Sequence, residues 1–254
     1  MTTLATPNAC LAPHSHQAGS RVVLLDGFKL TGGTGIITIP RGAERLLAFM
    51  AMRPRAVGRL LVANSLWADA TEGHAYAALR STLIRMNRTC RETLLVTPSS
   101  LELAPTVSVD LHDAQALAHR LLKAGPHAAV DLSVEAVATL SSELLPLWYD
   151  DWVLLEAEDW RQLRLHALEA VVAGLVEARR FGDATAAAGA VVRADPLRES
   201  AQTALIRVHL AEGNQSEAVH AFDRFSRLLH ADLGLAPTLE LRDLVEGRTG
   251  PPRR

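Results

Sequence analysis

The stretch HAYAALRSTLIRMNRTCR, residues 74–91, decides the fold of the chain. Its apolar residues recur every three or four positions, which predicts one amphipathic helix from His74 to Arg91. The predicted buried face consists of Ala75, Leu79, Leu83, Met86 and Cys90, and the opposite face of Ala77, Ser81, Ile84, Arg85 and Arg88, with Arg80 and Arg91 on a flank. No Asp or Glu lies in this stretch, so the exposed face suits a phosphate backbone and base edges. The alternative is a basic helix face that only contacts solvent, and the surrounding sequence must distinguish this from a face that contacts DNA.

Charge is distributed unevenly along the chain. Residues 21–109 hold eleven Lys and Arg against six Asp and Glu, a net charge of +5. The remainder from Asp110 carries a net charge of −7. A basic N-terminal half joined to an acidic C-terminal half is the division expected of a nucleic-acid reader attached to another module.

The segments around residues 74–91 predict a winged helix–turn–helix. Two further helices are predicted at residues 43–53 and 59–67, short strands within 21–39, and a β-hairpin from residues 94–97 and 101–103. Asp69 and Thr71 are candidate caps for the third helix. In this arrangement the third helix enters the major groove and the hairpin is the wing.

From Asp110 onward the sequence is nearly all helical, with helices predicted at residues 110–125 and 133–145. Gly182-Asp183 and Gly213-Asn214 each precede an Ala-containing helix and lie 31 residues apart, which approximates a tetratricopeptide period. The predicted fold class is therefore mainly α, with an N-terminal winged helix–turn–helix of α+β type followed by an all-α tetratricopeptide-like domain. The predicted boundaries are a disordered tail at 1–20, a DNA-binding domain at 21–109, a helical domain at 110–247 and a tail at 248–254.

Other classes of protein find little support. The two cysteines, Cys10 and Cys90, have no metal-like spacing, and no signal peptide or membrane-spanning run is evident, so we expect a cytoplasmic protein without a cofactor or metal. No set of residues forms a catalytic motif, and we expect no enzyme. The acids Asp150, Asp151, Glu156, Glu158 and Asp159 are interpreted as a solvated face rather than a metal site. Trp148, Tyr149, Trp152 and Trp160 are predicted to be core residues rather than a ligand cage.

Several segments resemble a known family. AERLLAFMAM, GRLLVANSLWAD, AALRSTLIRM and LELAPTVSVDL, within residues 21–109, resemble the DNA-binding half of the Streptomyces antibiotic regulatory proteins. The segment ADPLRESAQTALIRVHL, continued through LGLAPTLEL, resembles the bacterial transcriptional activator domain that follows the winged helix in that family. Asn87 stands where the family usually has arginine, and Ile84 stands where it often has an aromatic residue.

The resemblance implies a transcriptional activator. Such a protein binds repeated promoter sites in double-stranded DNA as a homodimer, recruits RNA polymerase, and turns on a secondary-metabolite gene cluster. In this chain we expect Ser81, Arg85 and Arg88 to face the groove beside Ile84, and Arg80 to contact DNA from the flank. His74 and Arg41, at the starts of predicted helices, are expected to contact phosphate.

An alternative interpretation comes from another class. The helical half could be a protein-interaction scaffold, carried by a degenerate winged helix that does not read DNA. The wing sequence Thr97–Ser100 contains no Lys or Arg, and Asn87 lacks a charge, which favours this alternative. The acid-free third helix and the basic N-terminal half oppose it.

Overall fold

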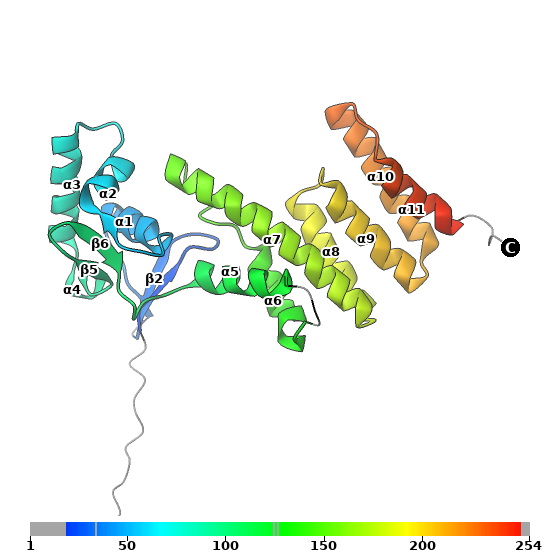
Figure 1. Cartoon of the computed structure of the whole chain (residues 1–254), viewed down its shortest axis with the longest axis horizontal. Helices are drawn as coiled ribbons and strands as arrows, with labels where there is room; N and C mark the ends of the chain where they lie inside the picture. Colours follow the sequence, from blue (N-terminus) through cyan, green and yellow to red (C-terminus); the bar gives the residue numbers. More distant parts are fainter. Residues whose placement is uncertain (1–18, 34, 124, 126, 250–254) are drawn as a thin grey trace, which may run out of the picture.

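The computed structural model describes residues 19–33, 35–123, 125 and 127–249. Two parts follow each other along the longest axis of the molecule, a mixed α/β half and a helical half (Figure 1). The predicted disordered tails fall largely on residues 1–18 and 250–254, which lie outside the described residues. Of the tail predicted at 248–254, Arg248 and Thr249 instead continue the last helix.

The N-terminal half contains two small sheets. The first has the strand order β3-β2-β1-β7 and is formed by β1 (Arg21–Val23), β2 (Lys29–Gly32), β3 (Gly35–Ile36) and β7 (Ser108–Val109). The second has the order β4-β6-β5 and is formed by β4 (Val57–Gly58), β5 (Leu94–Val96) and β6 (Ser100–Leu103). β5 and β6 are the predicted hairpin, whereas β4 and β7 were not predicted, because two residues are too few to show alternation.

Three helices accompany these sheets, namely α1 (Arg41–Ala51), α2 (Arg59–Leu66) and α3 (Glu72–Arg85). α1 contacts a strand of each sheet, and α3 packs on α1 and α2. Ala75, Leu79 and Leu83 of α3 are buried as the periodicity predicted. α1 approaches α3 closely at Gly42, where a side-chain carbon would lie 3.3 Å from the hydroxyl oxygen of Thr82. The mixed winged-helix part and the following all-helical part confirm the predicted fold class.

The prediction of one continuous helix from His74 to Arg91 is wrong. α3 ends at Arg85, because Met86 takes an extended backbone conformation with φ −64° and ψ 130°. A separate short helix, α4, covers Arg88–Arg91, and the side chain of Asn87 caps it by accepting a hydrogen bond of 2.8 Å from the backbone of Cys90. The buried Met86 and Cys90 keep helical spacing across the break, which explains why the periodicity concealed it.

The helical half consists of α5 (Asp110–Leu121), η1 (Ala129–Leu132), α6 (Val134–Ser141), α7 (Asp151–Glu177), α8 (Phe181–Ala194), α9 (Glu199–Glu212), α10 (Gln215–Leu233) and α11 (Leu239–Thr249). From α7 onward each helix packs against the next one in the chain, so the helices form a layered stack (Figure 1). In the described part of the chain, no helix is long and apolar enough to cross a membrane.

The helix hairpins repeat at a longer spacing than the glycines predicted. The residue that turns the chain between α7 and α8 is Arg179, with φ 57°, and the one between α9 and α10 is Gly213, with φ 89°. These equivalent left-handed positions lie 213 − 179 = 34 residues apart, which is the length of a tetratricopeptide repeat. The glycines lie only 31 residues apart because an arginine, not Gly182, occupies the first turn position.

A shared aromatic core joins the two halves. The ring of Phe49 from α1 meets that of Trp152 from α7 edge-on at 5.3 Å between centroids, and Trp148 lies 6.2 Å from both Phe28 and Trp152. Trp148, Trp152 and Trp160 are buried, as predicted, but Tyr149 is 78% exposed, so its predicted place in the core is wrong. The main hydrophobic cluster contains buried residues of both halves, and a second cluster lies among α9, α10 and α11.

Polar contacts reinforce this junction. Arg45 of α1 pairs with Asp150 at 2.5 Å, and Arg53 pairs with Glu156 of α7. Asp110, at the start of α5, accepts hydrogen bonds of 2.8 and 3.0 Å from the backbone amides of Leu24 and Leu25. Asp110 therefore begins α5 and also holds the start of the helical half to the first sheet.

Candidate nucleic-acid interface

The exposed face of α3 brings together most of the predicted contact residues. Arg80, Ser81, Ile84 and Arg85 are all exposed, and Ile84 is 68% exposed despite its apolar side chain. These positions share one side of the helix because they differ by one, three, four or five residues. The Nε of Arg85 donates a hydrogen bond of 3.2 Å to the backbone oxygen of Ser81, so the guanidinium lies along this face. The arrangement offers two cations, a hydroxyl and an apolar side chain, which are the groups that read base edges and thymine methyls.

Arg88 belongs to α4 rather than to this face. Its side chain is 93% exposed, and its Nε lies 2.9 Å from Oε1 of Glu92. Glu92 therefore partly neutralises Arg88, which the acid-free stretch ending at Arg91 did not reveal. Arg91 also has a structural role, because it donates a hydrogen bond of 2.6 Å to the backbone oxygen of Leu83 in the last turn of α3.

His74 lies in the first turn of α3 and is exposed. Its Nδ1 is 3.0 Å from the hydroxyl oxygen of Thr71, which is the N-cap residue of the helix. The predicted cap at Thr71 is thus at the N-cap position, but its hydroxyl contacts His74 and makes no capping bond to the backbone. His74 stands at the positive end of the helix dipole, where an anion would be stabilised.

Arg41 contacts a tryptophan of the helical half rather than the exposed face of α3. Its guanidinium carbon is 4.0 Å from the ring centroid of Trp148, and its Nη1 is 3.2 Å from Oε2 of Glu44. These contacts place Arg41 at the junction with the helical half, where it stacks on a buried tryptophan. Sequence reasoning could not find this contact because Trp148 lies 107 positions further along the chain, as 148 − 41 gives.

The wing is held by its own hydroxyl groups. The Oγ1 of Thr97 accepts hydrogen bonds from the backbone amides of Ser99 at 3.3 Å and Ser100 at 2.9 Å. It also lies 2.9 Å from Oγ of Ser100. The turn is therefore closed by Thr97, and the wing presents an uncharged, preformed edge beside α3.

Arg59 is a residue of this region that the sequence analysis missed. It begins α2, its backbone amide donates to the oxygen of Ser99 at 2.9 Å, and its Nη1 lies 3.4 Å from the oxygen of Thr97. Its guanidinium carbon is 5.6 Å from the ring centroid of Tyr76 on α3. Arg59 thus connects the wing with α3. The sequence offers one indication of its role, because Arg59 is the sole basic residue of the helix predicted at residues 59–67.

Other chemistry gains no support from the described residues. No group of three or more His, Cys, Asp or Glu side chains converges there in a way that could hold a metal ion. Asp150 pairs with Arg45 of α1 and Glu156 pairs with Arg53 just after α1, so these two acids hold the two halves together rather than forming a solvated face. Burial raises the pKa of the Cys90 thiol to about 11, which keeps it protonated and unreactive.

Comparisons with known proteins agree with this architecture. The sequence profile of the bacterial transcriptional activator domain matches residues 109–247. The fold resembles that of Mycobacterium tuberculosis EmbR, solved in complex with a low-affinity phosphopeptide, with a TM-score of 0.66 and 23% sequence identity. That alignment covers 91% of this chain and 65% of the EmbR chain. No curated protein sequence matches the chain.

A winged helix joined to a stack of helical hairpins, with this domain match, defines a transcriptional regulator rather than a class of enzyme. The chain belongs to the bacterial transcriptional activator domain family, and its organisation is of the Streptomyces antibiotic regulatory protein type. The resemblance noted in the sequence is thereby confirmed.

Proposed function

We propose that this chain is a sequence-specific DNA-binding activator. α3 enters the major groove of promoter DNA, and the wing lies against the adjacent backbone. The observation that carries the proposal is the exposed face of Arg80, Ser81, Ile84 and Arg85 on a helix whose other face is buried. Because the side chains on the buried face fix the orientation of α3, the exposed groups are held in one position before DNA binds.

The remaining parts of the proposal come from the family. The protein acts in the cytoplasm on repeated promoter sites as a homodimer, recruits RNA polymerase, and activates a secondary-metabolite gene cluster. In this assignment Ser81, Ile84 and Arg85 contact bases, whereas Arg80, Arg88 and His74 contact phosphate. Arg41 is assigned to the junction between the halves, in keeping with its stacking on Trp148.

The test is binding of the purified protein to promoter fragments flanking its own gene, at two salt concentrations with competitor DNA. Arg85→Ala is expected to reduce discrimination between specific and competitor DNA by about 1–3 kcal/mol, as for a base-reading arginine. Arg227→Ala, an exposed arginine of α10, is the matched control and should bind as the unmodified protein does. Equal binding by both variants would show that α3 does not read the operator.

The second candidate function is a protein-interaction scaffold whose winged helix does not bind DNA. The uncharged wing and the pairing of Arg88 with Glu92 favour it. A salt titration separates the two functions, because phosphate contacts release counterions and binding to DNA falls steeply with salt. Weak binding indifferent to sequence at both salt concentrations would favour the scaffold.

A further inference from the structure

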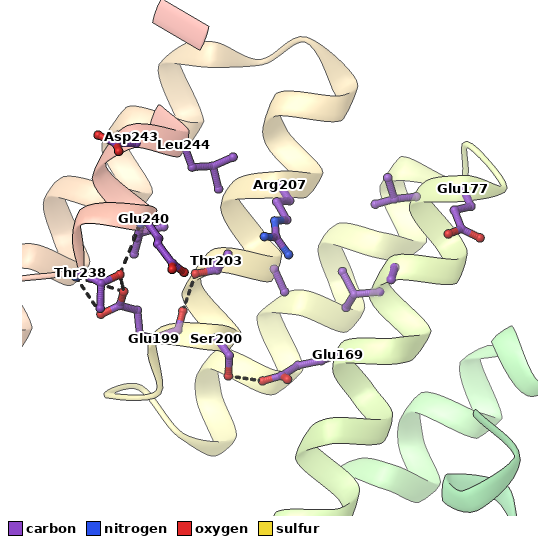
Figure 2. Close-up of a pocket in the computed structure, with 15 residues that line it drawn as sticks. Glu169, Glu177, Glu199, Ser200, Thr203, Arg207, Thr238, Glu240, Asp243 and Leu244 are labelled. Atoms are coloured by element: carbon purple, nitrogen blue, oxygen red, sulfur yellow. Dashed lines mark hydrogen bonds between the residues drawn. The ribbon is translucent and has the colours of Figure 1, made fainter. Parts of the chain in front are cut away.

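A groove of about 910 Å³ lies in the helical half, at the end of the molecule away from α3 (Figures 1 and 2). Residues of α7, α9 and α11 line it, together with Thr238 just before α11. These are alternate helices of the stack, so the groove runs across one face of three successive layers. Its location excludes any direct part in the contact between α3 and DNA.

The floor of the groove is apolar. α7 contributes Val172, Ala173 and Val176, α9 contributes Ala204, and α11 contributes Leu241 and Leu244. Ala173 is exposed, while Val176, Ala204 and Leu244 are half-buried, so their carbon atoms remain accessible along the groove. A surface of this kind gains free energy when an apolar side chain covers it.

The rim of the groove is acidic. Glu177, Glu240 and Asp243 line it and are exposed, and their side chains make no hydrogen bond or ion pair with another residue in the described part of the chain. Arg207 is the single cation among the lining residues. Figure 2 shows Glu177 on one side and Glu240 with Asp243 on the other, so the negative charges flank the floor. Arg207 lies between these acids in Figure 2 and offsets one of their charges, so the rim keeps a net negative charge that attracts a further cation.

The other two lining acids hold the groove in shape. Glu199 of α9 accepts hydrogen bonds from the backbone amide of Thr238 at 3.1 Å and from its hydroxyl, which fixes the start of α11 to the start of α9. Glu169 of α7 accepts from Nε of Arg198 at 2.9 Å and from Oγ of Ser200 at 2.6 Å, which fixes α7 to α9. The groove is therefore preformed, and binding does not require the helices to be ordered first.

We propose that this groove binds a basic, amphipathic peptide segment of a partner protein. Lysine or arginine side chains of the segment pair with Glu177, Glu240 and Asp243, and its apolar side chains cover the floor. The acidic rim excludes nucleic acid, whose phosphates it would repel. The inference does not depend on DNA binding by α3, because the two sites lie at opposite ends of the molecule (Figure 1).

The experiment measures binding of a fluorescein-labelled peptide of alternating lysine and leucine pairs to the full chain by fluorescence anisotropy. A peptide in which glutamate replaces lysine is the charge-reversed probe. The triple variant Glu177→Lys, Glu240→Lys, Asp243→Lys is expected to lose at least about tenfold in affinity for the basic peptide, since three exposed ion pairs become repulsive. Binding to the unmodified chain should weaken as salt is raised.

A matched triple variant controls for overall charge. Glu212→Lys, Asp223→Lys and Asp232→Lys change exposed acids of α9 and α10 that do not line the groove, and this protein should bind the basic peptide within about twofold of the unmodified chain. Ala204→Trp tests the floor without a change of charge and should also abolish binding. Circular dichroism and binding of promoter DNA show that each variant is folded.

Three results would overturn the proposal. The first is equal loss in both triple variants, which would mean that only net charge matters. The second is equal binding of the acidic and basic peptides. The third is binding that appears only when residues 250–254, which include Arg253 and Arg254, are removed, because the chain's own end would then be the occupant.

Discussion

At the scale of single residues, four arginines of the N-terminal half have four different environments. Arg85 lies along the exposed face of α3, Arg88 pairs with Glu92, Arg41 stacks on Trp148, and Arg59 bridges the wing and α3. The sequence placed Arg85 correctly on the exposed face of α3, because helical spacing depends only on neighbouring residues, but Arg88 lies in α4 rather than on that face. The sequence could not identify the role of Arg41, which depends on a tryptophan from the other half of the chain.

Glu92→Gln is expected to strengthen DNA binding. The substitution removes a carboxylate beside Arg88 and frees the guanidinium for phosphate, and an exposed pair of this kind is worth up to about 1 kcal/mol, or roughly fivefold in affinity. Electrophoretic mobility shifts at low and high salt measure the effect, which should shrink as salt rises. Glu212→Gln, on α9, serves as the control. Unchanged binding by Glu92→Gln would show that Arg88 does not face the DNA.

A pH-dependent contribution to stability is expected from Asp131. Hydrogen bonds from Arg120, at 2.8 and 3.3 Å, lower the pKa of this buried carboxyl. Because the folded-state pKa lies below the unfolded one, the stabilisation is present above about pH 4 and is lost as the pH falls through the folded pKa. Asp131→Asn should therefore lower the free energy of unfolding by about 1–3 kcal/mol at pH 7, and the difference should disappear in acid.

Urea denaturation at pH 7 and at stepwise lower pH measures this difference. Asp113→Asn is the control, since Asp113 pairs with Arg21 at 2.9 Å but is 65% exposed. An exposed pair contributes at most about 1 kcal/mol. A loss for Asp131→Asn that stays unchanged down to the most acidic pH of the series would contradict the assignment to ionisation and would point to packing instead.

At the scale of elements, the break between α3 and α4 separates the recognition helix from Arg88. The sequence predicted the helices and the hairpin well because the spacing of their apolar residues is regular over many positions. Met86 and Cys90 keep the helical spacing across the break, so the spacing did not reveal where α3 ends. Asn87 was the local sign of a new helix, since asparagine is a favoured N-cap residue. The strands β4 and β7 have two residues each, which is too short to show an alternation of apolar and polar side chains. The sheets that position the wing are therefore visible only in the folded chain.

Asn87→Ala is expected to destabilise α4. The substitution removes the hydrogen bond from Oδ1 to the amide of Cys90 and should cost about 1 kcal/mol of the free energy of unfolding. It should also weaken DNA binding modestly, because Arg88 at the start of α4 loses its fixed position. Thr89→Ala, an exposed change in the same helix, controls for helix composition. Equal stability of the two variants in urea would show that the cap contributes nothing.

At the scale of the whole molecule, the two halves share a hydrophobic core rather than a flexible linker. Phe49 and Trp152 meet across the junction, and Arg45 and Asp150 pair beside them. The aromatic-rich tract was predicted to be core, but its role in joining the halves was not, because the sequence does not show which elements meet. The two halves are therefore expected to unfold as one cooperative unit.

Trp152→Ala is expected to destabilise both halves together. Removal of a buried tryptophan should cost about 3–5 kcal/mol of the free energy of unfolding. Urea denaturation followed by far-ultraviolet circular dichroism and by loss of DNA binding should give the same lowered midpoint by both measurements. Tyr149→Ala, three residues earlier and 78% exposed, should leave the midpoint nearly unchanged. Separate midpoints in the unmodified chain would show that the halves unfold independently.

The continuous helix α7 has a consequence for promoter geometry. Its 27 residues span about 40 Å, with Trp152 against the winged half at one end and Val176 in the groove floor at the other. A partner seated in the groove is thus carried at a fixed distance and rotation from the operator. Activation should then depend on helical phase. Five base pairs inserted between operator and promoter would turn the partner to the far side of the duplex, and about ten would bring it back.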